Sequence, residues 1–265
     1  MSKPAGYITT DTSNDILTVT ICNPGKKNAI SQSMLREIEC IANEVSKSRS
    51  TRGVVLQGDG IEAFASGADI SEFEDSRDPD NSASYDRSSE GTLLSVAHIP
   101  VPTIAVVRGF CFGGGLSLAI TCDYRISDTT AQFAIPAARL GISYPVGSLK
   151  RLVDTVGPEH AKALLFTAER VDADRALRMN LVQEVLEPEA VAGRIELISV
   201  RLRENAPLSI VASKAIINSM VNRSPIDRET LDLASDMSNR CINSSDYKEG
   251  VRAFLERRSP KFTGS

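Results

Sequence analysis

Two glycine-marked segments are the places where residue type and spacing point to chemistry. The first reads FASGADI at 64–70, and the second reads GFCFGGGL at 109–116. In the second, three glycines precede an apolar run, so the N–H groups at the start of a helix stay clear of side chains and meet the positive end of the helix dipole. Such a nest of donors suits an anion, either a phosphate or the oxyanion of a thioester enolate.

The three glycines alone do not separate a binding role from a packing role, because close contact between a helix and a strand also requires glycine. No Lys-Ser or Lys-Thr pair follows them, which argues against a nucleotide-binding P-loop. No G-x-G-x-x-G motif follows a predicted strand either. The presence of two such segments is what favours a site for chemistry.

The elements around these segments alternate between strands and helices. Apolar runs at 53–58 and 103–107 predict fully buried strands, and a glycine closes or follows each run. Residues 116–122 are apolar nearly all round, which is typical of a buried helix. Further strands are expected at 124–127 and 132–135.

The N-terminal part predicts a hairpin and then a helix. Alternating apolar residues between 7 and 21 flank a turn at 13–15. Ser31 can cap the helix, whose apolar face is formed by Met34, Ile38, Ile41 and Val45.

From Ser148 onward the pattern is helical. Gly157–Pro158 predicts a break between helices, and Pro188 and Pro207 each predict a helix start. No strand is expected beyond about Ala190.

The predicted fold class is therefore α/β, with a core over residues 1–190 and an all-helical region over residues 191–265. Within the core, residues 72–90 are rich in Ser and Asp and poor in large apolar groups. They are interpreted as a mobile surface segment or a lid.

Composition and charge exclude several classes of function. The 265 residues include 30 Lys and Arg against 34 Asp and Glu, a net charge of −4 without long blocks of one sign. Nucleic acid is therefore not expected as a partner. The N-terminus lacks the apolar segment of a signal peptide, and no apolar stretch approaches the roughly 18 residues of a membrane span. These features predict a soluble, cytoplasmic protein without a membrane partner.

Cysteine and histidine offer no metal or nucleophile site. Five cysteines at irregular spacing predict free, buried thiols. The two histidines, His98 and His160, lie outside any cluster with metal-ligand spacing, so no metal is expected. The chain also lacks the G-x-S-x-G motif that would support a Ser-His-Asp hydrolase.

Several segments, in order and spacing, resemble the crotonase superfamily, also called the enoyl-CoA hydratase/isomerase family. They include FASGADI, RGFCFGGGLSLAITCDYRIS and AQFAIPAARLGI, and together they cover residues 23–30, 64–70, 108–127, 131–142, 165–186 and 205–216. This resemblance implies a spiral core of repeated ββα turns and C-terminal helices that assemble homotrimers, often paired into homohexamers.

The resemblance also implies an acyl-CoA substrate, with coenzyme A as part of the thioester and no tightly bound cofactor. Two backbone N–H donors would polarise the thioester carbonyl, and by motif position these belong to Ala68 and Gly114. Donors of this kind stabilise an enolate without any particular side chain.

The resemblance assigns coenzyme A contacts to five positions. The adenine contacts fall on the backbone of Ser66 and Ile70, and the phosphate contacts on Lys26 or Lys27. Arg257 occupies the place of a basic residue that completes the phosphate site of a neighbouring subunit. For each basic residue, a solvated surface charge is the alternative interpretation.

The sequence departs from the family pattern at the catalytic positions. Hydratases of the family use two glutamates, and this chain has Ser117 and Ala137 in their places. Isomerases and dehalogenases use a carboxylate or histidine about eight residues further on, where this chain has Pro145. Because one positioned acid or base contributes about 10² to 10⁴ in rate, water addition by the usual route is not expected to be efficient.

Tyr144 resembles a tyrosine of the family's decarboxylases. A phenol can donate to an oriented carboxylate, and the alternative is a buried tyrosine with a satisfied hydroxyl. Ser117 is suited to hold a water or to bond its own helix backbone. Arg139 and Arg151 are candidates for contacting a carboxylated acyl group or for structural ion pairs.

Three functions remain open from the sequence. The first is a lyase or isomerase resembling enoyl-CoA hydratase, and the second is a decarboxylase of a malonyl-type acyl-CoA that uses Tyr144. The third is a non-catalytic, coenzyme A-binding relative.

Overall fold

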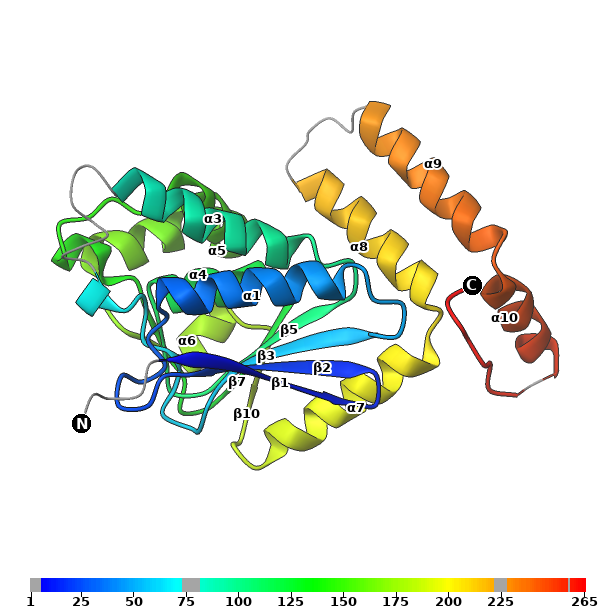
Figure 1. Ribbon diagram of the computed structural model, residues 1–265, viewed down its shortest axis with the longest axis horizontal. Helices are drawn as coiled ribbons and strands as arrows, with labels where there is room; N and C mark the ends of the chain where they lie inside the picture. Colours follow the sequence, from blue (N-terminus) through cyan, green and yellow to red (C-terminus); the bar gives the residue numbers. More distant parts are fainter. Residues whose placement is uncertain (1–5, 73–81, 222–227, 257) are drawn as a thin grey trace.

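The computed structural model describes residues 6–72, 82–221, 228–256 and 258–265 (Figure 1). The larger sheet has a parallel arrangement except for the antiparallel hairpin at one edge. Its strands lie in the order β1 (Tyr7–Ser13), β2 (Ile16–Cys22), β3 (Gly53–Gly58), β5 (Thr103–Val107), β7 (Tyr124–Asp128) and β10 (Glu184–Leu186).

A smaller sheet lies beyond the ends of these strands. It is ordered β4 (Ala63–Ala65), β6 (Phe110–Phe112), β8 (Gln132–Ala134) and β9 (Val171–Asp172). Successive strands alternate between the two sheets, so β3, β5 and β7 are followed by β4, β6 and β8. A helix follows each pair, namely α3 (Ser82–Ala97), α4 (Gly114–Thr121) and α5 (Val146–Thr167). This repeated ββα arrangement confirms the predicted fold class.

The central strands β3, β5 and β7 of the larger sheet are buried on both faces, which explains the continuous apolar runs of β3 and β5. On one face, α1 (Gln32–Val45), α3 and α4 cover a core that contains Val54 and Leu56. On the other face, α7 (Ala190–Glu204) covers Val55 and Ile104 with Val191. The parallel strands therefore present their carboxyl ends, and the glycine segments that follow, at one edge of a rigid body.

The N-terminal predictions are confirmed. The hairpin turns at Asn14 and Asp15, both with positive φ (52° and 62°), as a tight two-residue turn requires. Ser31 caps α1, because its Oγ accepts the N–H of Met34 at 3.3 Å. Ile41 differs slightly from the prediction, since it is only partly buried against the core.

Residues 82–90 of the segment predicted over 72–90 form the first half of α3, a helix that the prediction did not include, and residues 73–81 lie outside the described part. The helix escaped detection because its buried apolar anchors, Leu93 and Val96, lie in its second half. Its first half is held instead by Glu90, which pairs with Arg151 on α5.

Three smaller corrections concern the middle of the chain. The helical prediction from residue 148 missed β9 and β10, which are too short to show a two-residue periodicity. Two short 3₁₀ helices before that point, η1 (Ile70–Glu72) and η2 (Pro136–Arg139), were not predicted, whereas the helix α6 (Ala173–Arg178) lies within the region predicted to be helical. Of the cysteines, Cys40 is exposed and Cys241 is partly exposed, so the thiols are free but not all buried.

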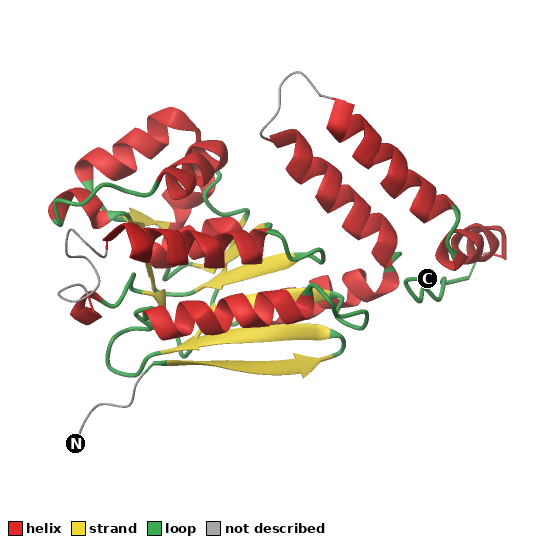
Figure 2. Ribbon diagram, turned by 45° about the horizontal axis from the view of Figure 1, so that its top comes forward, coloured by secondary structure: helices red, strands yellow, loops and turns green. Residues whose placement is uncertain are grey.

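The break predicted at Gly157–Pro158 is a kink within α5, where Gly157 has φ 78° and ψ 162°. Beyond residue 205 the chain leaves the sheet as α8 (Pro207–Val221), α9 (Arg228–Ile242) and α10 (Ser245–Glu256). Figures 1 and 2 both show α8 and α9 side by side and away from the sheet. Lys214 ties α8 to the core through Asp123 Oδ2 at 2.6 Å and the Val101 carbonyl at 2.9 Å. No helix among the described residues is long and apolar enough to cross a membrane.

Gly115 provides a test of how closely α4 packs on β4. A Cβ at Gly115 would lie 2.6 Å from the Ala65 carbonyl oxygen and 2.7 Å from the Ala65 Cβ. We expect Gly115→Ala to lower the free energy of unfolding by about 1–3 kcal/mol through overpacking. Gly91→Ala, in α3 with nothing within 4 Å of the added Cβ, should raise it by up to about 1 kcal/mol. Equal effects of the two variants in urea unfolding would contradict this packing account.

Candidate active site

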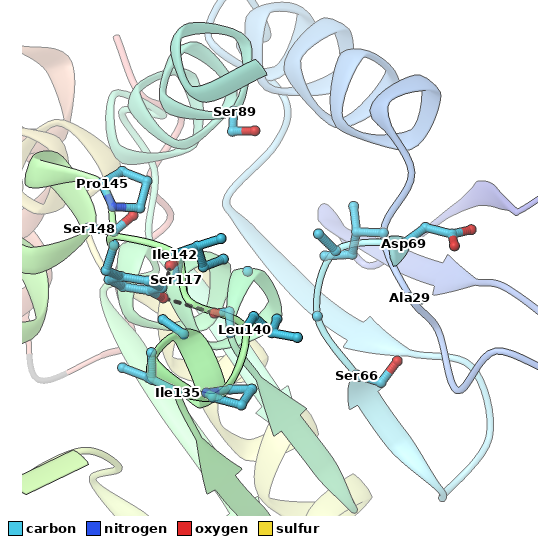
Figure 3. A pocket seen from close by; sticks show the side chains of 18 of the residues that line it. Ala29, Ser66, Asp69, Ser89, Ser117, Ile135, Leu140, Ile142, Pro145 and Ser148 are labelled. Carbon is cyan, nitrogen blue, oxygen red and sulfur yellow. Dashed lines mark hydrogen bonds between the residues drawn. The ribbon is translucent and has the colours of Figure 1, made fainter. Parts of the chain in front are cut away.

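Both glycine-marked segments line one cavity of about 680 Å³. Figure 3 shows the loop of Ser66 and Asp69 on one side, and Ser117 and Ile142 on the other. Most of the lining is apolar, formed by Ala29, Ile30, Leu35, Leu93, Ile135, Ala137, Leu140 and Ile142. The cavity is therefore suited to an apolar group beside a small number of polar contacts.

Backbone pairing between Ile30 and the loop that contains Ala68 sets the direction of the Ala68 N–H. Ile30 donates its N–H to the Gly67 carbonyl at 2.8 Å, and its own carbonyl accepts the N–H of Asp69 at 2.9 Å. In a parallel pair with this pattern, the residue between the two bonds turns its N–H to the opposite side. The Ala68 N–H is therefore left free of Ile30, on a residue that lines the cavity.

The Gly114 N–H is free for a different reason. Gly114 is the first residue of α4, and the first N–H groups of a helix have no partner within it. A Cβ placed on Gly114 would lie 3.5 Å from the Ala68 nitrogen. The two predicted donor residues are therefore neighbours in the wall of the same cavity, and the structure brings them together.

Glycine is required in both loops, at Gly67 before Ala68 and at Gly113 before Gly114. Gly113 has φ 47° and ψ −116°, and Gly67 has φ 120°, both in the region that side chains disfavour. The N–H of Gly113 is already used, because it donates to the Ala134 carbonyl at 2.9 Å. This bond anchors the loop to β8 and leaves the next N–H, that of Gly114, as the first open donor.

Ser117 and Tyr144 meet directly at the cavity wall. The Ser117 hydroxyl is hydrogen-bonded to the Tyr144 hydroxyl, and Tyr144 Oη donates to the Gly113 carbonyl at 3.0 Å. Burial raises the pKa of Tyr144 to about 12, so the phenol is neutral at neutral pH. Ser117 therefore bonds Tyr144 rather than its own helix backbone, and the Tyr144 hydroxyl is satisfied.

The other two expected catalytic positions supply no acid or base. Ala137 is buried in η2 and lines the cavity, and Pro145 precedes α5. Asp69 is the one carboxylate among the described cavity-lining residues, and it bonds Lys26 at 2.7 Å. Burial raises the pKa of Asp69, but the hydrogen bonds from Lys26 and Ser71 outweigh burial and hold that pKa below its usual value.

The residues expected to contact coenzyme A divide into two groups. Ser66 and Lys26 both line the cavity, and the Ser66 hydroxyl donates to the Lys26 carbonyl at 2.9 Å. Lys27 is instead exposed, with its Nζ 4.4 Å from the centroid of the Phe110 ring. Ile70 begins η1, beside Ser66 and Asp69 in the same loop. Arg257 lies outside the described residues.

Arg139 and Arg151, the two candidates for contacting a carboxylated acyl group, have different surroundings. Arg151 forms a two-point ion pair with Glu90 on α3, a contact that no local sequence signal indicated. Arg139 is exposed and lines the cavity. Within the described part of the chain, no group of three His, Cys, Asp or Glu side chains is placed to hold a metal ion.

Comparison with known proteins identifies the family. Residues 11–265 match the sequence model of the enoyl-CoA hydratase/isomerase family. The chain belongs to the enoyl-CoA hydratase/isomerase family. It is 33% identical over 244 residues to the short-chain-enoyl-CoA hydratase of Clostridium acetobutylicum, with 92% of each chain covered. It is also 33% identical over 242 residues to the crotonyl-CoA hydratase of Syntrophomonas wolfei, covering 91% and 92% of the two chains.

Solved structures agree with this membership. An enoyl-CoA hydratase/carnitine racemase from Magnetospirillum magneticum superposes with a TM-score of 0.92 at 32% identity, covering 97% of this chain and 96% of that one. The ββα spiral described above is therefore the crotonase fold, as the sequence resemblance implied. Within that family, Ser117 and Ala137 remain departures from the expected pair of glutamates.

The raised pKa of Tyr144 makes stability depend on alkaline pH. The unfolded chain releases the phenolic proton near pH 10.0, whereas the folded chain retains it to about pH 12. The contribution of the neutral phenol is therefore fully present below pH 10.0 and is lost as the pH rises through about 12. We expect the stability of the wild type relative to Tyr144→Phe, measured by urea unfolding, to decline across this range. If the difference in the free energy of unfolding between the wild type and Tyr144→Phe stays constant over this pH range, the pKa of Tyr144 is not raised in the folded protein.

Proposed function

We propose that this protein binds an acyl-CoA and stabilises the enolate of its thioester with the N–H groups of Ala68 and Gly114. The single observation that carries the proposal is the meeting of these two residues in the wall of an otherwise apolar cavity. Two fixed donors in a low-dielectric site favour the form of the substrate with negative charge on oxygen. The acyl chain would occupy the apolar part of the cavity.

Coenzyme A itself would be held at the loop that follows β4. We propose that the backbone of Ser66 and Ile70 receives the adenine and that Lys26 contacts a phosphate. Lys26 is supported by its place in the cavity lining, beside Ser66. Lys27 and Arg257 remain further candidates, and Lys27 would have to leave the ring of Phe110 to reach a phosphate.

The reaction class is constrained by what the cavity lacks. The relatives named above are hydratases, but the described cavity lining offers no free carboxylate to activate water. We therefore propose a lyase or isomerase of the hydratase type that depends on enolate stabilisation more than on general acid and base catalysis. A non-catalytic relative would bind coenzyme A thioesters without turnover.

Gly114→Ala tests the proposed donor pair. The added Cβ would stand 3.5 Å from the Ala68 nitrogen, an ordinary van der Waals distance, and both backbone N–H groups remain. We expect the methyl group to keep the thioester oxygen from reaching both donors, so that turnover of an acyl-CoA panel, read by mass spectrometry, falls by about 10²- to 10³-fold, as loss of one oxyanion contact does elsewhere. Gly193→Ala in α7, with nothing within 4 Å, is the matched control and should leave turnover unchanged.

Calorimetry with acetyl-CoA separates the remaining outcomes. Heat of binding without turnover of any panel member would favour the non-catalytic relative. Absence of heat at millimolar ligand would reject coenzyme A thioester binding altogether.

A second candidate is the decarboxylation of a malonyl-type acyl-CoA. It is favoured by Arg139, an exposed cation that lines the same cavity, and by the neutral groups at both glutamate positions. In this reaction the C–CO₂⁻ bond breaks, its electron pair forms the enolate, CO₂ leaves, and water supplies the final proton. Arg139 would orient the carboxylate, and the phenol of Tyr144 could donate to it only by giving up its hydrogen bond to the Gly113 carbonyl.

For this candidate we expect CO₂ release from methylmalonyl-CoA by the wild type. Arg139→Gln should raise KM because it removes the charge that pairs with the carboxylate, and Tyr144→Phe should slow release. Equal background rates for the wild type and both variants would exclude decarboxylation. Arg175→Gln, a surface cation that pairs with Glu169 at 2.7 Å, is the control for a change of net charge.

We also propose that α8, α9 and α10 mediate assembly into a homotrimer or a homohexamer. The proposal is supported by large apolar side chains that are exposed on these helices, namely Ile217, Met220, Val221, Ile242, Tyr247 and Val251. The proposal requires these side chains to form a continuous surface that another chain covers, since contiguous exposed apolar surface is typical of an interface.

A further inference from the structure

We propose that Tyr144 and Ser117 are positioning residues that hold and polarise the peptide group between Gly113 and Gly114. This inference rests on the proposed function, because the N–H of that peptide group is one of the two enolate donors. It gives a role to the side chain at the first glutamate position that needs neither an acid nor a base.

The decisive geometry is that one peptide group carries both the supported atom and the donor. The Gly113 carbonyl and the Gly114 N–H belong to the same planar unit, and in a trans peptide they point in opposite directions. Tyr144 Oη donates to that carbonyl at 3.0 Å, and the Ser117 N–H donates to it at 3.0 Å. Because the peptide group is planar, the hydrogen bonds that hold the Gly113 carbonyl also fix the direction of the Gly114 N–H.

The hydroxyl protons define the direction of this chain of hydrogen bonds. A phenol has one proton, and Tyr144 gives it to the Gly113 carbonyl. The Ser117 hydroxyl must then donate to Tyr144 Oη. Hydrogen bonds linked in one direction polarise one another, by about 10–30% per bond. The sequence Ser117, Tyr144, Gly113 carbonyl therefore strengthens the Gly114 N–H as a donor.

The glycine loop needs such external support. Gly113 adopts φ 47° and ψ −116°, and even an added Cβ there would have nothing within 4 Å. Gly113 and Gly114 therefore have no side chains of their own that could hold this peptide group by packing. The rigid neighbours do so instead, since Ser117 lies on α4 and Tyr144 packs against the main core.

The surroundings keep this support in one protonation state. Burial raises the pKa of Tyr144 to about 12, so its proton stays in place at neutral pH. Direct donation to substrate would require Tyr144 to give up its bond to Gly113. Positioning requires no such rearrangement, and it explains why Ser117, which is only 4% exposed, faces Tyr144.

The test uses acetoacetyl-CoA, whose β-keto thioester forms an enolate with near-ultraviolet absorbance. The apparent pKa of the bound ligand reports how strongly the donors stabilise negative charge on oxygen. We expect that pKa to lie below its value in free solution for the wild type. In Tyr144→Phe it should rise by about one unit, which is a tenfold loss of enolate stabilisation. In turnover assays the same variant should lower kcat with little change in KM.

Ser117→Ala should raise the pKa of the bound ligand less than Tyr144→Phe, because Tyr144 retains its bond to Gly113. The double variant should match Tyr144→Phe alone, since the serine acts only through the phenol. Tyr124→Phe is the matched control, because it removes a phenol hydrogen bond of 2.8 Å to Glu184 away from the cavity. It should leave the pKa of the bound ligand unchanged.

The outcomes separate this inference from the proposed function. If the wild type stabilises the enolate and folded Tyr144→Phe does so equally, the positioning role is wrong and the proposed function stands. If the effects of Ser117→Ala and Tyr144→Phe add independently, the linked chain of hydrogen bonds is wrong. If the wild type itself gives no enolate signal, both the proposed function and the positioning role fail.

Discussion

The meeting of Ala68 and Gly114 depends on one constraint, the adjacency of β4 and β6 in the smaller sheet. The loops that leave these parallel neighbours emerge side by side, so an N–H from each is brought to the same place. Ile30 then sets the direction of the first loop, and the start of α4 sets the second. Because every component is backbone, the arrangement depends on the fold and on glycine more than on reactive side chains.

This dependence explains how the family fold persists while the acid and base positions change. Ser117 and Ala137 are both buried, and neither alters the elements that carry the donors. Fold membership therefore identifies the backbone framework to which we assign enolate stabilisation as a proposal, whereas the surrounding side chains decide which reaction a framework of this kind serves. In this chain the first glutamate position is occupied by Ser117, which offers no carboxylate. The Ser117 hydroxyl bonds Tyr144, and Tyr144 in turn bonds the carbonyl of Gly113.

The sequence predicted the parts of the structure that local patterns encode. The Ser31 cap of α1, the apolar runs of β3 and β5, and the glycine-led start of α4 all carry their own signal in adjacent residues. The contacts that shape the cavity do not, because their partners are far apart in the chain. Ser117 meets Tyr144 across 27 residues, and Glu90 meets Arg151 across 61. The first half of α3 was not predicted for the same reason. It is linked to α5 by an ion pair between distant residues, and it has no apolar stripe that a local pattern could reveal.

The charge balance of the cavity sets the type of chemistry that fits it. Its one carboxylate among the described residues, Asp69, is neutralised by Lys26, and its phenol is neutral at neutral pH. Under the proposed function, charge that develops on a substrate oxygen would be met by fixed dipoles, without a proton transfer from the protein. Such a site serves reactions in which the substrate supplies the electron pair, as a departing carboxylate does, better than reactions in which the protein must first remove a proton. In the proposed decarboxylation, Arg139 in the lining would pair with the carboxylate of the acyl group. Because Asp69 is already paired with Lys26, that carboxylate would meet a cation and no unpaired acid among the described lining residues.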